Sequence, residues 1–497
     1  MRIRLLIGIA VVVKLLVSFF VELGNDEVYY VTYARYPAWS HFDHPPMIGW
    51  VLQLFTLNLT FTHDLALRLG MVVLGAGSLY FLYRIGSSVM NQKAGVLTAL
   101  LGATSVYTGI IAGMFVMPDV PQMFFWTAAL FTFINALTDV PRTNRWLFFT
   151  GLAMAGAMAS KYHSVFLVAG LFAFVVFNRP DLLKKGMLWA MFLMAGLGLL
   201  PTLIWNLGND FVSFSFHSER VLPESWLPNF ETFGMEILGQ FLYQNPVIFV
   251  VLLFAVGNMV RQRKHLPPAT RMLLWVAVPL YLVFTGFALY RRTLPHWTGP
   301  AFVSLLPLAA AYVTARSTKF YQRVAWGTTA FGCLVVALGA LQIQTGFITL
   351  DPIHRDPHNL MKDDATLDMY GWKQAAEAIA QHVAKGNDVV LLANGWFPTA
   401  HVDHYISRPL GFRTLALGKP EQIHKFWWIN STVPIMPNQR FIYYTDSRNY
   451  KHPADAIACD AGIGRCDTLW LSRGGTSSKA IFLFEIENFT TDCFSSQ

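Results

Sequence analysis

The stretch that decides the fold is GNDEVYYVTYARYPAWSHFDHPPMIGW, residues 24–50, which separates the first apolar run of the chain from the second. It is too polar to cross a bilayer, and it carries two adjacent carboxylates, Asp26 and Glu27. Carboxylates at the mouth of a membrane span usually face water or a cavity, because burying them in lipid is costly. We therefore expect an outer-face loop that takes part in chemistry. A solvated loop that only joins two spans is the alternative.

Two further groups of side chains follow these carboxylates. The first is a run of tyrosines at positions 29, 30, 33 and 36. The second is Asp43 and His44, which directly precede the pair Pro45 and Pro46. Proline fixes its own φ angle and lacks a backbone N–H, so we expect Asp43 and His44 on a rigid turn.

The composition indicates a polytopic membrane protein. Of 497 residues, 54% are hydrophobic and 13% are charged, and the mean hydropathy is +0.42. A soluble protein carries roughly twice that share of charged residues. The net charge of +8 does not indicate a nucleic-acid partner, because the basic residues are spread over short loops and form no single basic face.

The sequence predicts about eleven transmembrane helices. A span needs roughly 20 apolar residues. The first apolar run, residues 5–21, has no small-residue cleavage pattern after it, so we interpret it as a retained span with a cytoplasmic N-terminus. The other predicted spans lie near residues 64–83, 94–113, 121–138, 146–160, 163–178, 187–205, 246–260, 272–290, 299–315 and 324–342.

The loop cations predict the orientation of these spans. Cytoplasmic loops of membrane proteins are enriched in Lys and Arg. Among the short loops, one alternate set holds nearly all of these cations: Arg84, Lys93, Arg142, Arg145, Arg179, Lys184, Lys185, Arg261, Arg263, Lys264, Arg271, Arg316, Lys319 and Arg323. The loops at 22–62 and 206–246 and the C-terminal tail are then on the outer face.

Three cations break this pattern, because Lys161, Arg291 and Arg292 fall on the same outer side as Asp26 and Glu27. Ammonium and guanidinium groups neutralise phosphate oxygens, so cations next to carboxylates are expected of an anion-binding site. The alternative is that these side chains reach out to lipid headgroups.

Two other outer-side features are notable. Asp119 lies between Pro118 and Pro121, where it is either the N-cap of the next span or a functional carboxylate. The longer outer loop at 206–246 contains His217, Glu219 and Arg220 close together and could cover the membrane surface. A metal site at His217 and Glu219 lacks further ligands nearby.

The composition changes after about residue 345 and predicts a small α/β domain at residues 346–497. A breaker-rich linker at 351–359 is followed by an amphipathic helix at 366–386 and a buried strand at 388–395. Further strands are predicted near 441–445, 468–472 and 480–486. Cys459 and Cys466 could close a small disulfide loop if this tail faces an oxidising compartment, and free thiols are the alternative.

Five motifs, in this order and on one side, resemble the bacterial branch of the protein O-mannosyltransferase-like glycosyltransferases. These are C-superfamily membrane enzymes that include the aminoarabinose transferase of lipid A. The resemblance covers residues 1–345 and, by architecture, the outer domain. The motifs are Asp26-Glu27, Phe42-Asp43-His44-Pro45-Pro46, Pro118-Asp119-Val120-Pro121, Ser160-Lys161-Tyr162 and Pro295-His296-Trp297.

The resemblance implies a glycosyltransferase C-superfamily fold and an inverting transfer of a sugar from a polyprenyl-phosphate donor. The acceptor would be a hydroxyl or phosphate of an envelope glycolipid such as lipid A, at the periplasmic face of the inner membrane. Asp26 matches the family's catalytic aspartate, and Glu27 matches its companion. His44 and Tyr29 fall where the aminoarabinose enzyme has a lysine and an arginine, so the sugar and phosphate contacts need not be identical.

The residues taken alone fit this chemistry. An inverting transfer needs a base opposite the leaving group, and we expect Asp26 to be that base. The leaving lipid phosphate needs its charge neutralised rather than a general acid. Cations that could do so are Lys161, Arg291, Arg292, His44 and His296. Side chains that could position the acceptor or line the cavity are Asp43, Asp119, Tyr29 and Tyr30.

Other readings remain open at this point. A protein hydroxyl is the alternative acceptor, and a secondary transporter is the alternative class, although transporters usually show duplicated halves. No cofactor is required, and a divalent cation could be held by the carboxylates as in distant members of the superfamily. Expected partners are the lipid-linked donor, the acceptor and membrane lipids, without nucleic acid.

Overall fold

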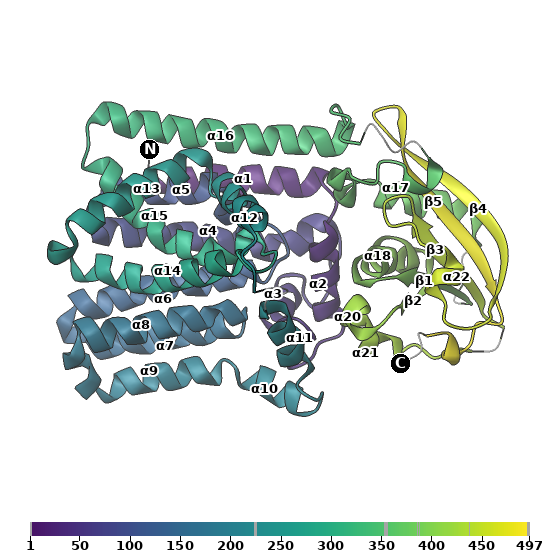
Figure 1. Cartoon of the computed structure of the whole chain (residues 1–497), viewed down its shortest axis with the longest axis horizontal. Helices are drawn as coiled ribbons and strands as arrows, with labels where there is room; N and C mark the ends of the chain where they lie inside the picture. Colours follow the sequence, from purple (N-terminus) through teal and green to yellow (C-terminus); the bar gives the residue numbers. More distant parts are fainter. Residues whose placement is uncertain are drawn as a thin grey trace. The chain divides into compact units, whose positions relative to one another are not determined.

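The apolar runs form helices in the computed structural model (Figure 1). It describes residues 2–222, 226–351, 356–384, 386, 388–436 and 438–494. The chain divides into two compact units. The first comprises Met1–Leu16 and Ala38–Val336, and the second comprises Val17–Pro37 and Ala337–Gln497.

Among its described residues, the first unit contains helices and connecting loops but no strands. The ends of its first and last helices belong to the second unit. Its helices are α1 (Ile3–Phe20), α3 (Met47–Phe55), α4 (Asp64–Val89), α5 (Gln92–Thr104), α6 (Asp119–Thr138), α7 (Thr143–Met158), α8 (Val165–Asn178), α9 (Gly186–Leu197), α10 (Leu200–Leu207), α11 (Val212–Val221), α12 (Phe230–Tyr243), α13 (Pro246–Arg261), α14 (Pro268–Phe287), α15 (Gly299–Thr314) and α16 (Thr318–Thr345).

Within the described residues, seven helical segments are long and apolar enough to cross a membrane. An eighth is possible if α12 and α13, which meet at a bend of 105°, count as one broken span. The predicted spans near 94–113, 146–160 and 163–178 are helical, but α5, α7 and α8 fall short of full spanning length. The structure therefore fits a polytopic membrane protein, and the number of about eleven spans stays a prediction.

Burial separates the central helices of this unit from the peripheral ones. In α6 and in the segment Pro295–Thr314, which ends with α15, 78% of the apolar stretch is buried. The buried share is 17% in α1 and 11% in α16. Helix α6 packs against α4 and α7. Small residues permit this close packing: a Cβ atom at Gly77 of α4 would lie 2.6 Å from the ring of Phe124 of α6. Central α6 can therefore hold a polar side chain away from lipid.

The second unit is built on a five-stranded mixed sheet of order β2-β1-β3-β5-β4 (Figure 1). Strand β1 pairs in parallel with β2 and β3, whereas β5 is antiparallel to β3 and β4. The four predicted strands are all present. The strands are β1 (Val389–Asn394), β2 (Arg413–Leu417), β3 (Arg440–Asp446), β4 (Gly462–Arg473) and β5 (Thr476–Glu487).

Short helices connect these strands. The helix predicted at 366–386 is shorter than expected, because Gly371 adopts a φ of +89° and breaks it into a 3-10 turn and α17. Of the predicted linker at 351–359, residues 352–355 lie outside the described residues. The helices after α16 are α17 (Trp372–His382), α18 (Trp396–His401), α19 (Arg408–Leu410), α20 (Pro420–Ile423), α21 (Phe426–Asn430) and α22 (Pro453–Ala456).

Helix α2 (Asn25–Arg35), which carries Asp26 and Glu27, belongs to the second unit. It packs against α18. The second unit begins again at Ala337 and also includes residues 17–37, which no feature of the local sequence indicates. The stretch predicted as an outer loop thus contains a regular helix, which ends before the turn predicted at Asp43 and His44.

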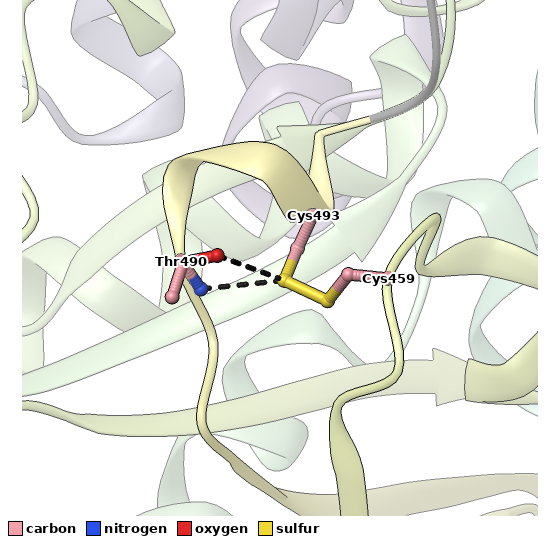
Figure 2. Close-up of a disulfide and its surroundings, with 3 residues drawn as sticks. All are labelled: Cys459, Thr490 and Cys493. Atoms are coloured by element: carbon pink, nitrogen blue, oxygen red, sulfur yellow. Dashed lines mark hydrogen bonds between the residues drawn. A yellow bond between two sulfur atoms is a disulfide. The ribbon is translucent and has the colours of Figure 1, made fainter.

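The predicted disulfide between Cys459 and Cys466 is wrong, because Cys459 is bonded to Cys493 (Figure 2). Cys466 is a free, exposed cysteine on β4. Between Gly462 and Cys466 the extended strand advances about 13 Å, at roughly 3.3 Å per residue. That distance carries Cys466 away from Cys459, whereas the turn at Thr491–Cys493 returns the chain to it.

Loss of this bond is expected to destabilise the second unit. The bond closes a separation of 34 residues, and such cross-links typically contribute about 2–4 kcal/mol. Cys459→Ser should therefore lower the unfolding temperature measured without reductant. Cys466→Ser, at the exposed thiol, is the matched control and should change stability by less than about 0.5 kcal/mol. Equal losses in both variants would contradict the observed pairing.

Candidate functional site

A buried ion pair lies at the start of α6. Lys161 Nζ is 2.8 Å from Asp119 Oδ2, and the two side chains are 5% and 1% exposed. Tyr107 donates its hydroxyl to Asp119 Oδ1 at 3.0 Å. A buried charge pair is retained only when further hydrogen bonds satisfy its oxygens, as the tyrosine does here. Two of the predicted site residues are therefore in direct contact.

Local sequence explains how these two side chains meet. Pro118 is the N-cap of α6, so Asp119 is the first helical residue and the prediction that it is an N-cap is wrong. Its carboxylate is free to accept from Lys161 and Tyr107 instead. Lys161 follows the end of α7 and has an extended backbone, with φ −158° and ψ 139°, before a 3-10 turn leads into α8.

Histidines and an arginine surround the ion pair. His163 and His296 both lie within electrostatic range of Lys161 and Asp119. His44 lies within range of Lys161 and Arg220. The structure thus brings together four predicted residues, Asp119, Lys161, His44 and His296, in the first unit.

Arg220 is a residue of this cluster that the sequence reasoning did not assign. Its guanidinium carbon lies 5.1 Å from the ring centre of Phe216 and 5.8 Å from that of Trp297. Its charge acts on both His44 and His296. The sequence feature that could have identified Arg220 is its spacing from His217. Residues three apart share one face of a helix, so both side chains lie on the same face of α11.

Asp43 and His44 are covered by α11. His217 Nε2 lies 2.7 Å from the carbonyl oxygen of Asp43, which can only accept, so Nε2 carries the proton. The rings of Phe42 and Phe216 are 4.5 Å apart. Loss of solvent around the ring lowers the pKa of His44 well below its usual value, and the charge of Lys161 lowers it further. Burial also lowers the pKa of His217, which the Asp43 carbonyl opposes.

These two histidines predict acid sensitivity. Their pKa values in the folded protein lie below the unfolded value of about 6.5, so the unfolded chain binds more protons between the two values. The contribution of these two histidines to the free energy of unfolding is therefore fully present above about pH 6.5 and is lost as the pH falls below that value. Thermal unfolding in detergent should show a declining midpoint from pH 7.5 to pH 5.

The slope of that decline identifies its source. His44→Gln removes one titrating group and should make the decline shallower. The matched control is His265→Gln, at an exposed side chain, which should leave the slope as in the wild type. A decline that is as steep in His44→Gln as in the wild type would exclude His44 as a contributor.

The predicted roles of Arg291 and Arg292 receive no support from the geometry. Arg291 Nη1 donates to the carbonyl oxygens of Glu219 and Leu222, at 2.7 and 2.9 Å, and so binds the end of α11. Arg292 is exposed. Arg220 is a further cation whose charge, like that of Lys161, acts on His44 and His296, and the roles of Arg291 and Arg292 stay predictions.

The two adjacent carboxylates of the second unit differ in environment. Asp26 is exposed in the first turn of α2. Glu27 is 2% exposed, and its Oε2 accepts the backbone N–H of Gly24 at 3.0 Å as part of a capping box. Asp26 is therefore accessible to a reactant, whereas Glu27 holds the start of the helix.

Tyr29 and Tyr30 are buried, and their predicted role at the acceptor or the cavity stays a prediction. They are 1% and 4% exposed. The Tyr29 ring lies 5.1 Å from that of Trp396 and 5.8 Å from that of His424. Helical spacing turns the tyrosine run toward α18, which the sequence of the loop alone does not indicate.

The possible divalent cation finds no preformed site. Among the residues that the structure describes, no three His, Cys, Asp or Glu side chains are grouped so that they could hold a metal ion. The available carboxylate of the buried cluster, Asp119, is already bound by Lys161 and Tyr107. We assign no step to a metal.

Sequence comparisons agree with this architecture. Residues 43–205 match the family model described as dolichyl-phosphate-mannose-protein mannosyltransferase. The chain is also 26% identical over 298 residues to the lipid A galacturonosyltransferase RgtD of Rhizobium johnstonii. That match covers 56% of this chain and 59% of the relative, which is less than two thirds of its length.

Structural comparisons extend over nearly the whole chain. ArnT from Cupriavidus metallidurans, solved with bound undecaprenyl phosphate, superposes with a TM-score of 0.63 at 13% identity, over 99% of this chain and 98% of ArnT. The Archaeoglobus fulgidus oligosaccharyltransferase superposes with a TM-score of 0.51 at 12% identity, over 90% and 69% of the chains. The chain thus shares the fold of these two solved proteins. Among the solved structures it is related to ArnT, so the predicted resemblance is confirmed.

Proposed function

We propose that this protein transfers a sugar from a polyprenyl-phosphate-linked donor to a hydroxyl or phosphate of a cell-envelope glycolipid, with inversion. The reaction takes place at the periplasmic face of the inner membrane, where the C-terminal unit also lies. Lipid A is the acceptor class that the relative RgtD supports by its name. The bound undecaprenyl phosphate of ArnT supports the donor class.

The observation that carries the proposal is the cationic cluster around Lys161. Lys161 and Arg220 are accompanied by His44 and His296 within electrostatic range. Such a set neutralises a phosphate better than a single exposed cation, because it is partly shielded from water. The neutral His44 can take up a proton when an anion arrives, which adds charge only in the bound state.

Each group has one role in the reaction. Asp26 removes the proton of the acceptor hydroxyl while that oxygen forms a bond to the anomeric carbon of the sugar. The bond from this carbon to the lipid phosphate oxygen breaks, and the polyprenyl phosphate leaves with the electron pair. Lys161 and Arg220 stabilise the negative charge on the leaving phosphate. Asp119 orients Lys161 through their ion pair.

The test is transfer by the purified protein in vesicles of bacterial phospholipid. The donors are radiolabelled undecaprenyl-phosphate sugars, one neutral hexose and one hexuronic acid, because the relative RgtD is named for galacturonic acid. The acceptors are purified lipid A and a total envelope extract. We expect label to move to lipid A. Label in a protein fraction would indicate the alternative acceptor.

Binding without transfer to any fraction would contradict the proposed reaction. Uptake of the labelled donor across the vesicle membrane without a covalent product would instead indicate the transporter class. The vesicle assay distinguishes these outcomes directly, since the product is extracted and separated from the donor.

A further inference from the structure

The sheet of the second unit has a topological switch point between β1 and β3. These two strands are parallel neighbours. The chain leaves β1 toward β2 on one side and leaves β3 toward β5 and β4 on the other. In open α/β sheets of this kind, ligands bind in the crevice beyond the carboxyl ends of the two strands.

Charged side chains gather at this end of the sheet, and one of them is buried. Directly after β3, Arg448 forms an ion pair of 2.5 Å with Asp368. Lys479 donates to the carbonyl oxygen of Leu367 at 3.2 Å and lies 4.2 Å from the ring centre of Trp372. Lys479 is 2% exposed. A buried ammonium group therefore lies at the same end of the sheet as a partly exposed ion pair.

Residues 22–25 of the same chain contact Asp368 of this charged group and the start of α17. Glu22 accepts the backbone N–H groups of Trp372 and Lys373, at 2.8 and 3.1 Å, at the positive N-terminal end of α17. The N–H of Leu23 donates to the Tyr405 hydroxyl at 2.7 Å. Three hydrogen bonds therefore hold two consecutive residues.

Asn25, two residues after Leu23, is held by a histidine. His401 Nε2 lies 3.0 Å from Asn25 Oδ1, and the carboxylate of Asp368 also interacts with the Asn25 side chain. His401 is fully buried, and its ring stacks on Trp372 with 3.9 Å between ring centres and 4° between planes. The stacking fixes the direction of the Nε2–H bond. Asn25 directly precedes Asp26.

The far end of α2 is held as well. Arg35 Nη1 lies 2.7 Å from Asp403 Oδ2, and Arg408 Nε lies 2.9 Å from the same oxygen. Arg408 also donates to the Tyr36 hydroxyl at 3.0 Å. Both ends of the helix are thus attached to the segment between β1 and β2.

We propose that the C-terminal unit is a positioning domain, in which the switch-point crevice grips residues 22–25 and thereby fixes the backbone that presents Asp26. Tyr405 and His401 are its principal positioning residues. This inference rests on the proposed role of Asp26 as the base. A base must stand within hydrogen-bond reach of the proton that it removes, so a small displacement of α2 lowers turnover more than donor binding.

The test compares variants that remove a hydrogen bond to residues 22–25 with variants that keep these hydrogen bonds. Tyr405→Phe removes the acceptor of the Leu23 N–H, and His401→Leu removes the donor to Asn25. His401→Gln keeps an N–H donor at a similar reach. Tyr443→Phe is the matched control, because Tyr443 is a buried tyrosine of the same unit that donates to the carbonyl of Lys451, away from residues 22–25.

We expect kcat to fall about 10-fold or more in Tyr405→Phe and His401→Leu, with the donor KM within about 2-fold of the wild type. His401→Gln should recover most of kcat, and Tyr443→Phe should keep it. Hydrogen exchange at residues 23–31 should accelerate in Tyr405→Phe but not in Tyr443→Phe. Unchanged kcat despite faster exchange would overturn the proposal, as would losses of kcat that match between Tyr405→Phe and Tyr443→Phe.

Failure of the underlying function has a different signature. If the wild type transfers sugar but Asp26→Asn does so equally well, Asp26 is not the base, whatever the Tyr405 and His401 variants show. If Asp26→Asn is inactive and the Tyr405 and His401 variants are fully active, the base assignment stands and the positioning role is wrong.

Discussion

Asp26→Asn is expected to reduce sugar transfer by about 10²- to 10⁴-fold, the usual contribution of a positioned general base. The side chain is exposed in the first turn of α2. Asparagine keeps its size but cannot accept the acceptor proton. Because the cations that we propose bind the donor phosphate belong to other elements of the chain, donor binding should stay within about 2-fold of the wild type. Equilibrium binding of labelled donor and initial rates of transfer measure the two effects separately.

Two comparisons make this result specific. Glu231→Gln removes another exposed, first-turn carboxylate, on α12, and should leave transfer unchanged. Glu27→Gln keeps an oxygen that can accept the Gly24 N–H, so we expect less than about a 10-fold loss. If Asp26→Asn retained near-normal turnover, the proton would have to go elsewhere and the base assignment would be wrong.

Much of the fold could be predicted because hydropathy is a local property. Apolar runs of span length and breaker residues between them indicated helices in the right places, and a change in composition after residue 345 indicated the α/β unit. The Asp119 and Lys161 motifs could be found for a related reason: polar residues beside apolar runs stand out on either side of a span. The ion pair between these two residues, with 2.8 Å between Lys161 Nζ and Asp119 Oδ2, could not be predicted, because it depends on how α6 packs against α7.

What the sequence concealed were contacts between distant residues. The hydrogen bond from Leu23 to Tyr405 joins residues 382 positions apart, and no periodicity records such a contact. The disulfide was assigned by closeness in sequence, but a strand moves Cys466 away from Cys459. Arg291 was assigned by its side of the membrane, which does not determine which carbonyl oxygens its guanidinium meets.

The buried pair of Asp119 and Lys161 leads to the second large effect. Lys161→Met should lower the stability of the folded protein by about 3–5 kcal/mol, because it leaves the Asp119 carboxylate buried without its partner. It should also abolish detectable donor binding at micromolar concentration, since the cluster loses its central cation. Asp119→Asn should destabilise by a similar amount, because it leaves the ammonium group unpaired. Thermal unfolding and donor titration are the measurements.

The double variant Lys161→Met with Asp119→Asn separates structure from function. It removes both charges, so stability should return most of the way toward the wild type, as in other buried pairs replaced together. Donor binding should not return, because the phosphate still lacks its cation. The matched control is the exposed pair of Arg179 and Asp181, where Arg179→Met should change stability by less than about 1 kcal/mol. Normal donor binding in the stable double variant would assign Lys161 a purely structural role and leave Arg220 as the phosphate-binding cation.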